Sequence, residues 1–446
     1  MNNTFHVSIS NIQHIKELQF SIDLSQNRLV CIAGKNSVGK TTLIRAIKNI
    51  TSADTFPKTA SPYIFKDDSK IKYLIDDKEY AFNYSKKLNL IDSKELIDES
   101  IKSNIFVELP IPHGIRFNHF QKLSDIDEEL RTKISLSQYS TPNDLVSFLS
   151  KIYSSERFGS IKEITIKNEK YYFILRDNNF YIREDYFSSG EYFVIRLYKL
   201  IQKKCKLIVI DEIDISLDAS AQTNLLTELR AYCESYQINI IFTTHSLPLM
   251  KTLEPSELHY MEEQYQKIEI KNVSYNYVKS ILFGFKGWDK YILTEDEMIA
   301  KYLNHLISGI EDKTFYSYKI IYIGGASNVI NLMQRNDTEE FFSSNKNVIS
   351  VLDGDTKEQK YAKNNERILF IPFDNIEKEL ATHYKNNAFG FKVEVIGSEK
   401  NYNKNLYNHI IRSKLMTESQ IFNHINEGKL KEKEELKSAL IEYLNA

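Results

Sequence analysis

The segment Gly34-Lys35-Asn36-Ser37-Val38-Gly39-Lys40-Thr41 constrains what this 446-residue chain can fold into more than any other feature. It matches the pattern GxxxxGK followed by Ser or Thr, and it lies between an apolar run, 29–33, and a helically spaced stretch that begins at Thr41. In such a strand, loop and helix, backbone N–H groups and the helix N-terminus bind phosphate oxygens. We expect Lys40 to contact the β and γ phosphates and Thr41 to ligate Mg2+. The flanking strand and helix disfavour the alternative, a purely structural glycine turn.

A second segment supplies the acidic groups that such a phosphate site needs. The short apolar run Leu207–Ile210 predicts a buried strand that ends at Asp211 and Glu212. Asp211 is the candidate for the Mg2+ shell, and Glu212 is the candidate base that polarises water. Buried strands also end on acids for solubility alone, but the position of this pair after Lys40 favours the functional interpretation.

Two further segments can contact phosphate. The run Ser188-Ser189-Gly190-Glu191 opens a predicted helix that continues to 203, so hydroxyls, a backbone N–H and the helix dipole meet at one point. The same run is also an ordinary helix N-cap with an early acid, which is the better interpretation of this segment alone. His245 follows a predicted strand, 238–242, where an imidazole can meet a γ phosphate, although a lone histidine is more often structural.

In chain order these segments resemble the ATP-binding-cassette (ABC) class of ATPases over roughly residues 1–275, with a D-loop at Ile215–Asp218. The resemblance implies ATP and Mg2+ as cofactors, and a homo-oligomer, dimer or tetramer, in which the signature segment of one protomer completes the ATP site of another. A glutamine loop is also expected, but the sequence does not assign it, and Gln121 is only a guess. The residues placed at ATP are Gly34, Lys35, Asn36, Ser37, Val38, Gly39, Lys40, Thr41, Thr42, Ser188, Ser189, Gly190, Glu191, Asp211 and His245.

A different acidic constellation lies in the second half of the chain. Strands are predicted at 291–293, 319–323, 348–352 and 368–373. Glu295 follows the first of these strands, and Asp353 and Asp355 follow the third. Because the carboxyl ends of parallel strands share one edge, these acids can converge, and clustered carboxylates favour Mg2+ or Mn2+. The alternative is a plain Asp-Gly-Asp turn and a helix-capping acid.

This second constellation resembles a TOPRIM domain, with Glu295 as the first acid, Gly324-Gly325 after the second strand, and Asp353 and Asp355 as the DxD pair. Glu377 corresponds to the additional acid of TOPRIM nucleases, whereas Asp296 stands where a glycine usually follows the first acid. An ABC-type ATPase followed by TOPRIM is the layout of the OLD (overcoming lysogenization defect) nucleases, which include Gabija-type and retron-associated antiphage effectors. The resemblance implies two divalent ions, held by Glu295, Asp353, Asp355 and Glu377, in phosphodiester hydrolysis.

Composition limits the classes of partner and compartment. The formal net charge is −2, so a nucleic-acid contact would need a local patch. The candidates for such a patch, which can equally be a solvated face, are Lys357, Lys360, Lys363, Arg367, Lys400, Lys404, Arg412 and Lys414, with Tyr402, Tyr407 and His409. Three cysteines without a CxxC pair fit a reducing cytoplasm, and the sequence has no secretory signal and no apolar run of about 20 residues.

The sequence therefore predicts an α/β protein with three parts. These are an ABC-type P-loop ATPase domain over 1–275 with an insert at about 50–185, a smaller TOPRIM-like domain over 286–395, and a helical segment over 396–446. The predicted function is that of a cytoplasmic ATPase and metal-dependent endonuclease of antiphage defence, with DNA favoured as substrate. A regulatory protein, or a reverse transcriptase with its DNA product, is a candidate partner. The alternatives are a non-nucleolytic ATPase of DNA repair or chromosome maintenance and an ATPase-coupled RNA or tRNA nuclease.

Overall fold

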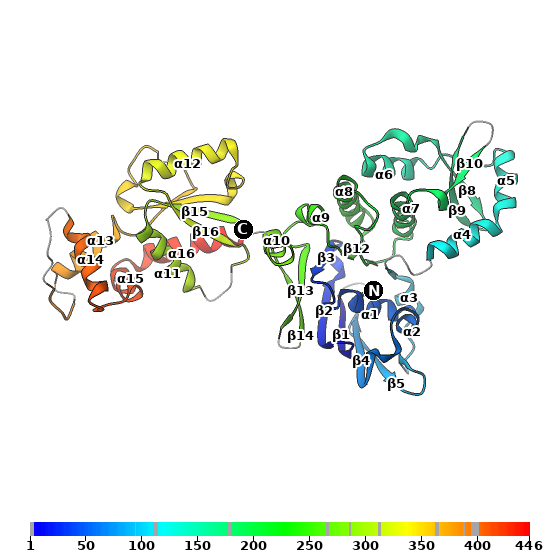
Figure 1. Ribbon diagram of the computed structural model, residues 1–446, viewed down its shortest axis with the longest axis horizontal. Helices are drawn as coiled ribbons and strands as arrows, with labels where there is room; N and C mark the ends of the chain where they lie inside the picture. The colour runs from blue at the N-terminus through cyan, green and yellow to red at the C-terminus, as the bar shows by residue number, and fades with distance from the viewer. Residues whose placement is uncertain are drawn as a thin grey trace. The chain divides into compact units, whose positions relative to one another are not determined.

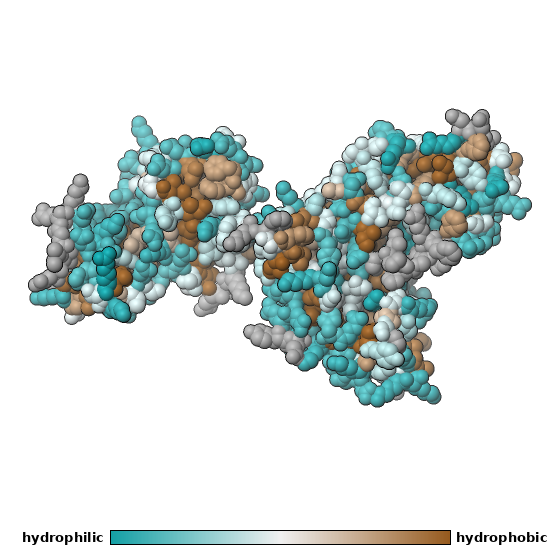
Figure 2. All heavy atoms as spheres, in the orientation of Figure 1, coloured by the Kyte–Doolittle hydropathy of each residue, from teal (hydrophilic) through white to brown (hydrophobic). Residues whose placement is uncertain are grey.

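The computed structural model describes residues 4–93, 95–109, 115–176, 180–264, 267–284, 287–310, 314–361, 365–386, 389–393 and 401–446 (Figure 1). The chain divides into two compact units, Met1–Val278 and Lys279–Ala446. Hydrophilic residues cover most of the visible surface of each unit, and hydrophobic residues gather there in smaller patches (Figure 2). None of the described helices is both long enough and apolar enough to cross a membrane.

One eleven-stranded sheet organises the first unit. Its strands are β1 (Thr4–Ile12), β2 (Ile15–Asp23), β3 (Leu29–Gly34), β4 (Phe65–Ile75), β5 (Lys78–Ser85), β6 (Leu90–Asp92), β7 (Ile105–Glu108), β11 (Leu207–Ile210), β12 (Asn239–Thr243), β13 (Leu258–Gln264) and β14 (Lys267–Asn272). Their order across the sheet is β6-β5-β4-β1-β2-β14-β13-β3-β12-β11-β7. The described helices are α1 (Lys40–Asn49), α2 (Thr55–Thr59), α3 (Glu99–Ser103), α4 (Ile115–Asp125), α5 (Asp127–Ser135), α6 (Asn143–Tyr153), α7 (Ser189–Ile201), α8 (Ala219–Tyr236), α9 (Leu247–Lys251) and α10 (Tyr275–Phe283).

The centre of this sheet is parallel and positions the candidate nucleotide site. The strands β7, β11, β12, β3 and β13 pair side by side in parallel. Every residue of β3, β11 and β12 is buried, as expected for strands that are covered on both faces. The predicted parallel α/β sheet is therefore confirmed, and its carboxyl edge carries the residues that follow β3, β11 and β12.

Part of the insert forms a small separate layer. The strands β8 (Ile161–Ile166), β9 (Glu169–Leu175) and β10 (Tyr181–Arg183) make an antiparallel sheet, in which β9 pairs with both β8 and β10. Buried Leu123, Leu130 and Ile134 from α4 and α5 belong to the same core cluster as the buried residues of β8 and β9. The sequence alone did not place these helices.

The second unit contains a four-stranded parallel sheet in the order β16-β15-β17-β18. Its elements are β15 (Lys290–Thr294), α11 (Glu297–Ser308), β16 (Tyr318–Tyr322), α12 (Ala326–Glu339), β17 (Val348–Leu352), β18 (Ile368–Phe370), α13 (Ile376–Lys385), α14 (Tyr402–Arg412), α15 (Glu418–Asn426) and α16 (Leu430–Asn445). The predicted C-terminal helices are thus confirmed. The last strand ends three residues earlier than predicted, before Pro372, which has no N–H for a ladder hydrogen bond.

Successive side chains of β15 and β17 point to opposite faces of this sheet and pack into two different cores. Ile292, Ile349 and Val351 join a cluster with α11, α15 and α16, whereas Leu293 and Leu352 join a cluster with α12. Figure 1 shows α12 on one side of the sheet and α11 and α16 on the other. Burial of both faces fixes the register, so that Glu295 and Asp353 follow neighbouring strands directly.

Candidate functional site

The glycine-rich loop between β3 and α1 holds Lys40 over its own backbone. The Lys40 Nζ donates hydrogen bonds to the carbonyl oxygens of Gly34 (2.7 Å) and Lys35 (3.1 Å). Burial lowers the pKa of Lys40, and the negative charges of Asp211 and Glu212 oppose that shift. The ammonium therefore lies inside the loop, at the N-terminus of a helix, where phosphate oxygens can compete for it.

Two glycines of the loop cannot carry a side chain. A Cβ on Gly34 would lie 2.7 Å from the Met261 carbonyl oxygen. Gly39 caps α1 with φ at +112°, and a Cβ there would lie 2.7 Å from Ile15 Cδ1. Backbone conformation and close approach together explain why the loop needs glycine at these two positions.

The other predicted loop residues differ in exposure. Lys35, Asn36 and Ser37 are exposed, and Val38 and Thr41 are half-buried. Thr42 is buried, and its hydroxyl donates a 2.5 Å hydrogen bond to Gln13 Oε1. The structure thus places the hydroxyl of Thr42 toward the turn between β1 and β2.

Thr243, at the end of β12, connects the two acidic residues that follow β11. Its hydroxyl donates to Asp211 Oδ1 (2.6 Å) and accepts from the Glu212 backbone N–H (2.8 Å). Sequence reasoning missed this role, although a threonine directly after an apolar strand was a visible signal. Asp211 Oδ2 is buried without a hydrogen-bond partner, so it is a hard oxygen donor of the kind that fits Mg2+.

Glu212 and His245 both lie within electrostatic reach of Asp211 and Lys40. Burial raises the pKa of Glu212, and the charges of Asp211 and Asp214 raise it further, which suits a candidate base. Burial and the charge of Lys40 lower the pKa of His245, so its imidazole is neutral at neutral pH. The electrostatic influence of Lys40 on both groups agrees with one shared site at the carboxyl edge of the sheet.

The run Ser188–Glu191 starts α7 with a capping box. The Ser188 hydroxyl accepts from the Glu191 N–H (3.2 Å), and the Glu191 carboxylate accepts from the Ser188 N–H (3.0 Å). The N-cap interpretation of this segment is therefore confirmed. Glu191 also pairs with Arg157 at 2.8 Å. A Cβ on Gly190 would lie 2.5 Å from the Ser216 carbonyl oxygen, so α7 touches the predicted D-loop directly.

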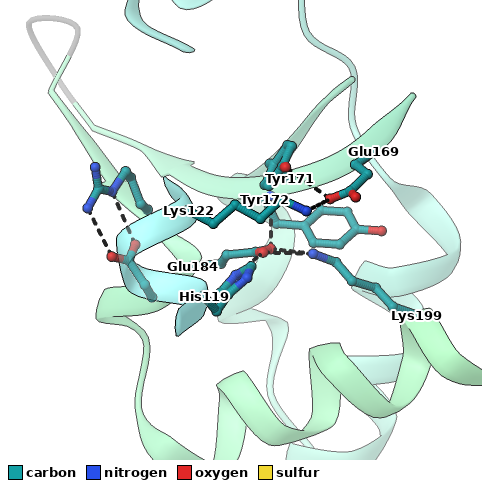
Figure 3. Close-up of polar contacts among 9 residues, drawn as sticks. His119, Lys122, Glu169, Tyr171, Tyr172, Glu184 and Lys199 are labelled. Carbon is teal, nitrogen blue, oxygen red and sulfur yellow. Dashed lines mark hydrogen bonds and ion pairs between the residues drawn. The ribbon is translucent and has the colours of Figure 1, made fainter. Parts of the chain in front are cut away.

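A buried carboxylate anchors α7 to the insert. Figure 3 shows Glu184 between His119, Tyr172 and Lys199. Its Oε1 lies 2.7 Å from Lys199 Nζ and 2.8 Å from His119 Nε2, and its Oε2 accepts from the Tyr172 N–H at 3.0 Å. Burial favours the neutral acid, but Lys199 and His119 outweigh it and lower the pKa of Glu184. This network fixes the chain four residues before Ser188.

The end of β7 is the strand end next to Asp211. Glu108 there is buried, and its carboxylate accepts a 2.9 Å hydrogen bond from Arg196 on α7. Burial raises the pKa of Glu108, and Arg196 and Lys48 oppose that shift. Gln121, the guess for the glutamine loop, is exposed on α4. Glu108 therefore connects the ATPase core to α7, whereas no described contact gives Gln121 that place.

In the second unit, Glu295 and Asp353 are brought together. Glu295 Oε1 accepts a 2.9 Å hydrogen bond from the Asp353 N–H. Asp353 Oδ2 accepts from Asn375 Nδ2 (3.0 Å), whereas its Oδ1 is buried without a partner. Burial, opposed by Asn375 and reinforced by Glu295, raises the pKa of Asp353 to about 7. In the sequence, Asn375 is recognisable only as a residue that precedes a helix. In the structure its side chain caps α13.

The remaining predicted acids lie around this pair. Asp355 is exposed in the turn after Asp353, and burial raises the pKa of Glu377 on α13. Asp296 caps α11, as the alternative interpretation expected. Within the described ranges, no three His, Cys, Asp or Glu side chains lie close enough together to hold a metal ion. The described contact is therefore between Glu295 and Asp353, and a closed cluster with Asp355 is not formed.

The structure narrows the candidate nucleic-acid patch. Tyr407 is buried and so offers no stacking face, which corrects that prediction. Arg367 pairs with Asp337 at 2.6 Å. Lys363 and Lys400 lie outside the described residues. Lys357, Lys360, Lys404, Arg412, Lys414 and His409 are exposed, and Tyr402 is half-buried. These exposed cations are compatible with a solvated face as well as with phosphate binding.

Comparison with known proteins finds a similarity to one protein family within the first unit. Residues 58–251 match the family model described as "AAA domain, putative AbiEii toxin, Type IV TA system". This range contains Asp211, His245 and the run at Ser188, and it begins after the glycine-rich loop. This part of the chain is thus similar to a P-loop ATPase domain of this AAA type.

A curated relative and solved structures give weaker likenesses. The oligopeptide transport ATP-binding protein OppF of Mycoplasma genitalium is 22% identical over 183 residues, which are 40% of this chain and 20% of that protein. The head domain of SMC from Thermotoga maritima is 15% identical with a TM-score of 0.37, covering 61% of this chain and all of that one. An ATP-binding cassette of an ABC transporter, in its ADP conformation, is 12% identical with a TM-score of 0.33, over 62% and 94% of the two chains.

Replacing Glu184 tests the buried network. Glu184→Gln should lower the free energy of unfolding by about 3 kcal/mol, because Lys199 loses its buried counter-charge. Since the folded pKa is lowered, the wild-type contribution is present above the ordinary glutamate pKa of about 4.3 and is lost as the pH falls below it. Urea unfolding measures both effects. Lys122→Gln, which breaks an exposed pair with Glu169, is the control and should cost less than about 1 kcal/mol.

Replacing Asp353 tests the uncompensated carboxylate. Because its folded pKa of about 7 exceeds the unfolded value of about 3.9, wild-type stability should fall as the pH rises between them. Asp353→Asn should therefore be more stable than wild type at pH 8, by about 1 to 3 kcal/mol, in metal-free urea unfolding. Asp374→Asn, which alters an exposed pair with Lys378, serves as the control. A destabilised Asp353→Asn variant at pH 8 would contradict the argument.

Proposed function

We propose that this protein is an ATP-binding and ATP-hydrolysing enzyme whose second unit is a divalent-metal-dependent endonuclease, with DNA the favoured substrate. The observation that carries the nuclease proposal is the carboxylate of Asp353. It is buried at the end of a central parallel strand and keeps one oxygen without a partner, and the Asp353 backbone N–H donates a hydrogen bond to the acid that follows the neighbouring strand. A buried carboxylate of this kind is costly unless a cation or another partner compensates it.

The residues at this edge fit a hard cation. Glu295 and Asp353 supply oxygen donors, which suit Mg2+ or Mn2+, and Asp355 and Glu377 lie on the adjoining turn and helix. A bound divalent ion supplies an activated water and stabilises the leaving oxygen of a phosphodiester. Asn375 orients the Asp353 carboxylate through one oxygen and leaves the other without a partner.

The first unit supports the ATPase part of the proposal. Lys40 and Thr41 begin the helix after the loop, and Asp211, Glu212 and His245 lie on the same carboxyl edge of the parallel sheet. Asp211 and Thr41 would hold Mg2+ with ATP, and Glu212 would orient water. We place the run Ser188–Glu191 at the ATP of a second copy, which makes the functional protein a homo-oligomer.

The biological part of the proposal is an antiphage or toxin-like effector. The description of the matching family names a putative toxin of a type IV toxin–antitoxin system, which supports a toxin-like effector role. A regulatory protein, or a reverse transcriptase with its DNA product, is the proposed partner. The three cysteines are buried and free, which is consistent with the proposed cytoplasmic location.

Metal binding can be measured without any substrate. At pH 8, Mg2+ or Mn2+ without nucleotide should raise the Tm of the wild-type protein, because the cation compensates the buried carboxylate. Asp353→Asn should show little of this increase, whereas Asp374→Asn should behave as wild type. Equal metal-dependent increases in all three proteins would contradict a cation site at Asp353.

Cleavage assays test the enzymatic proposal. Plasmid DNA, single-stranded DNA and total tRNA are incubated with the full chain, with Mg2+ or Mn2+ and with or without ATP. We expect wild-type cleavage that falls at least about 100-fold in Asp353→Asn and loses its ATP response in Lys40→Ala. Cleavage of tRNA alone would establish the RNA alternative. If the effector activity in cells survives Asp353→Asn but not Lys40→Ala, the nuclease proposal would be overturned in favour of a non-nucleolytic ATPase.

A further inference from the structure

The side-chain amide of Gln222, in the first turn of α8, joins two segments of the candidate ATP site. Its Nε2 donates to the carbonyl oxygens of Leu217 (2.8 Å) and Asp214 (3.3 Å). Its Oε1 accepts a short hydrogen bond from the hydroxyl of Ser246. Gln222 is buried, so water does not replace these partners freely. One carboxamide therefore connects the segment 214–217 to the residue that follows His245.

The segment 214–217 is a compact turn that follows the candidate base, Glu212, by two residues. The Ile215 N–H donates to the Glu212 carbonyl (3.2 Å), and the Leu217 N–H donates to the Asp214 carbonyl (3.3 Å). Glu212 and Ser216 have φ values of +56° and +74°, a conformation that non-glycine residues rarely adopt. Such a turn persists only where its surroundings hold it, and the two hydrogen bonds from Gln222 are part of that support.

The same turn contacts the start of α7. Because a Cβ on Gly190 would lie 2.5 Å from the Ser216 carbonyl oxygen, no side chain separates the helix from the turn. On the other side of Gln222, Ser246 caps α9 and its N–H donates to the Thr244 hydroxyl (3.0 Å). The loop that carries His245 is thus connected through Gln222 and the turn to the helix that begins at Ser188.

We propose that Gln222 is a positioning residue that couples the His245 loop to the helix of the Ser188–Glu191 run. The inference rests on the proposed ATPase function and deepens it, because His245 faces the ATP of its own chain and the run faces the ATP of a second copy. Only an amide of this length supplies an acceptor for Ser246 and donors for two carbonyls at once. Gln222→Glu keeps the acceptor but places a second acceptor against the Leu217 and Asp214 carbonyls.

Steady-state ATP hydrolysis tests the coupling. Gln222→Met should lower kcat by about 10- to 100-fold, because His245 and Glu212 lose their relative placement, while KM for ATP changes less than about threefold. Gln222→Glu should resemble Gln222→Met. Thr227→Ala, an exposed position on the same helix, is the control and should match wild type. The double variant Gln222→Met with Ser246→Ala should be no slower than Gln222→Met alone, because both substitutions break the same hydrogen bond between Gln222 and Ser246.

Hydrogen exchange gives a second readout that does not require turnover. ATP with Mg2+ should protect amides at 35–42, 243–247 and 189–193 in the wild-type protein. In Gln222→Met, protection at 35–42 should remain while that at 189–193 is lost. Retained protection at 189–193, or an unchanged kcat, would overturn the inference. No ATP-dependent protection of wild type at 35–42, as in Lys40→Ala, would instead overturn the proposed function, so the two failures are distinguishable.

Discussion

The hydrogen bonds of the Thr243 hydroxyl tie together the ends of two neighbouring parallel strands. One bond holds the carboxylate of Asp211, and the other holds the backbone of Glu212 in a conformation with positive φ. Because β12 lies between β3 and β11, this contact also fixes the acids relative to the glycine-rich loop. The direction in which the chain leaves Asp211 determines where the turn at 214–217 lies. The contact of that turn with Gly190 and its hydrogen bonds from the Gln222 amide therefore depend on this direction as well.

Two buried acids of this protein, Glu184 and Asp353, differ in the way their charge is compensated. Glu184 has cationic partners on both sides and its pKa is lowered, so it holds elements together. Asp353 has an amide on one oxygen and no partner on the other, and its pKa is raised. A folded chain seldom keeps the second arrangement without a use, because hydrogen bonds alone do not offset the burial of charge. Distinguishing the two kinds required coordinates, since both acids follow short strands in the sequence.

The parts of the fold that the sequence predicts well are those with strong local signals. The runs at 29–33 and 207–210 are apolar and buried at every position, so both strands follow from pattern alone. The helices α4 and α5 were not predicted, because their few buried residues pack on a small sheet distant in the chain. Sequence reasoning also missed the roles of Thr243, Asn375 and Gln222, since each contacts a partner 22 or more residues away.

The eleven-stranded sheet ends on short strands at both edges. The edge strand β6 has three residues and the edge strand β7 has four, whereas β1 and β2, which lie inside the sheet, each have nine. A short edge offers few free N–H and C=O groups to an approaching chain. The large sheet is therefore protected against becoming a template for aggregation.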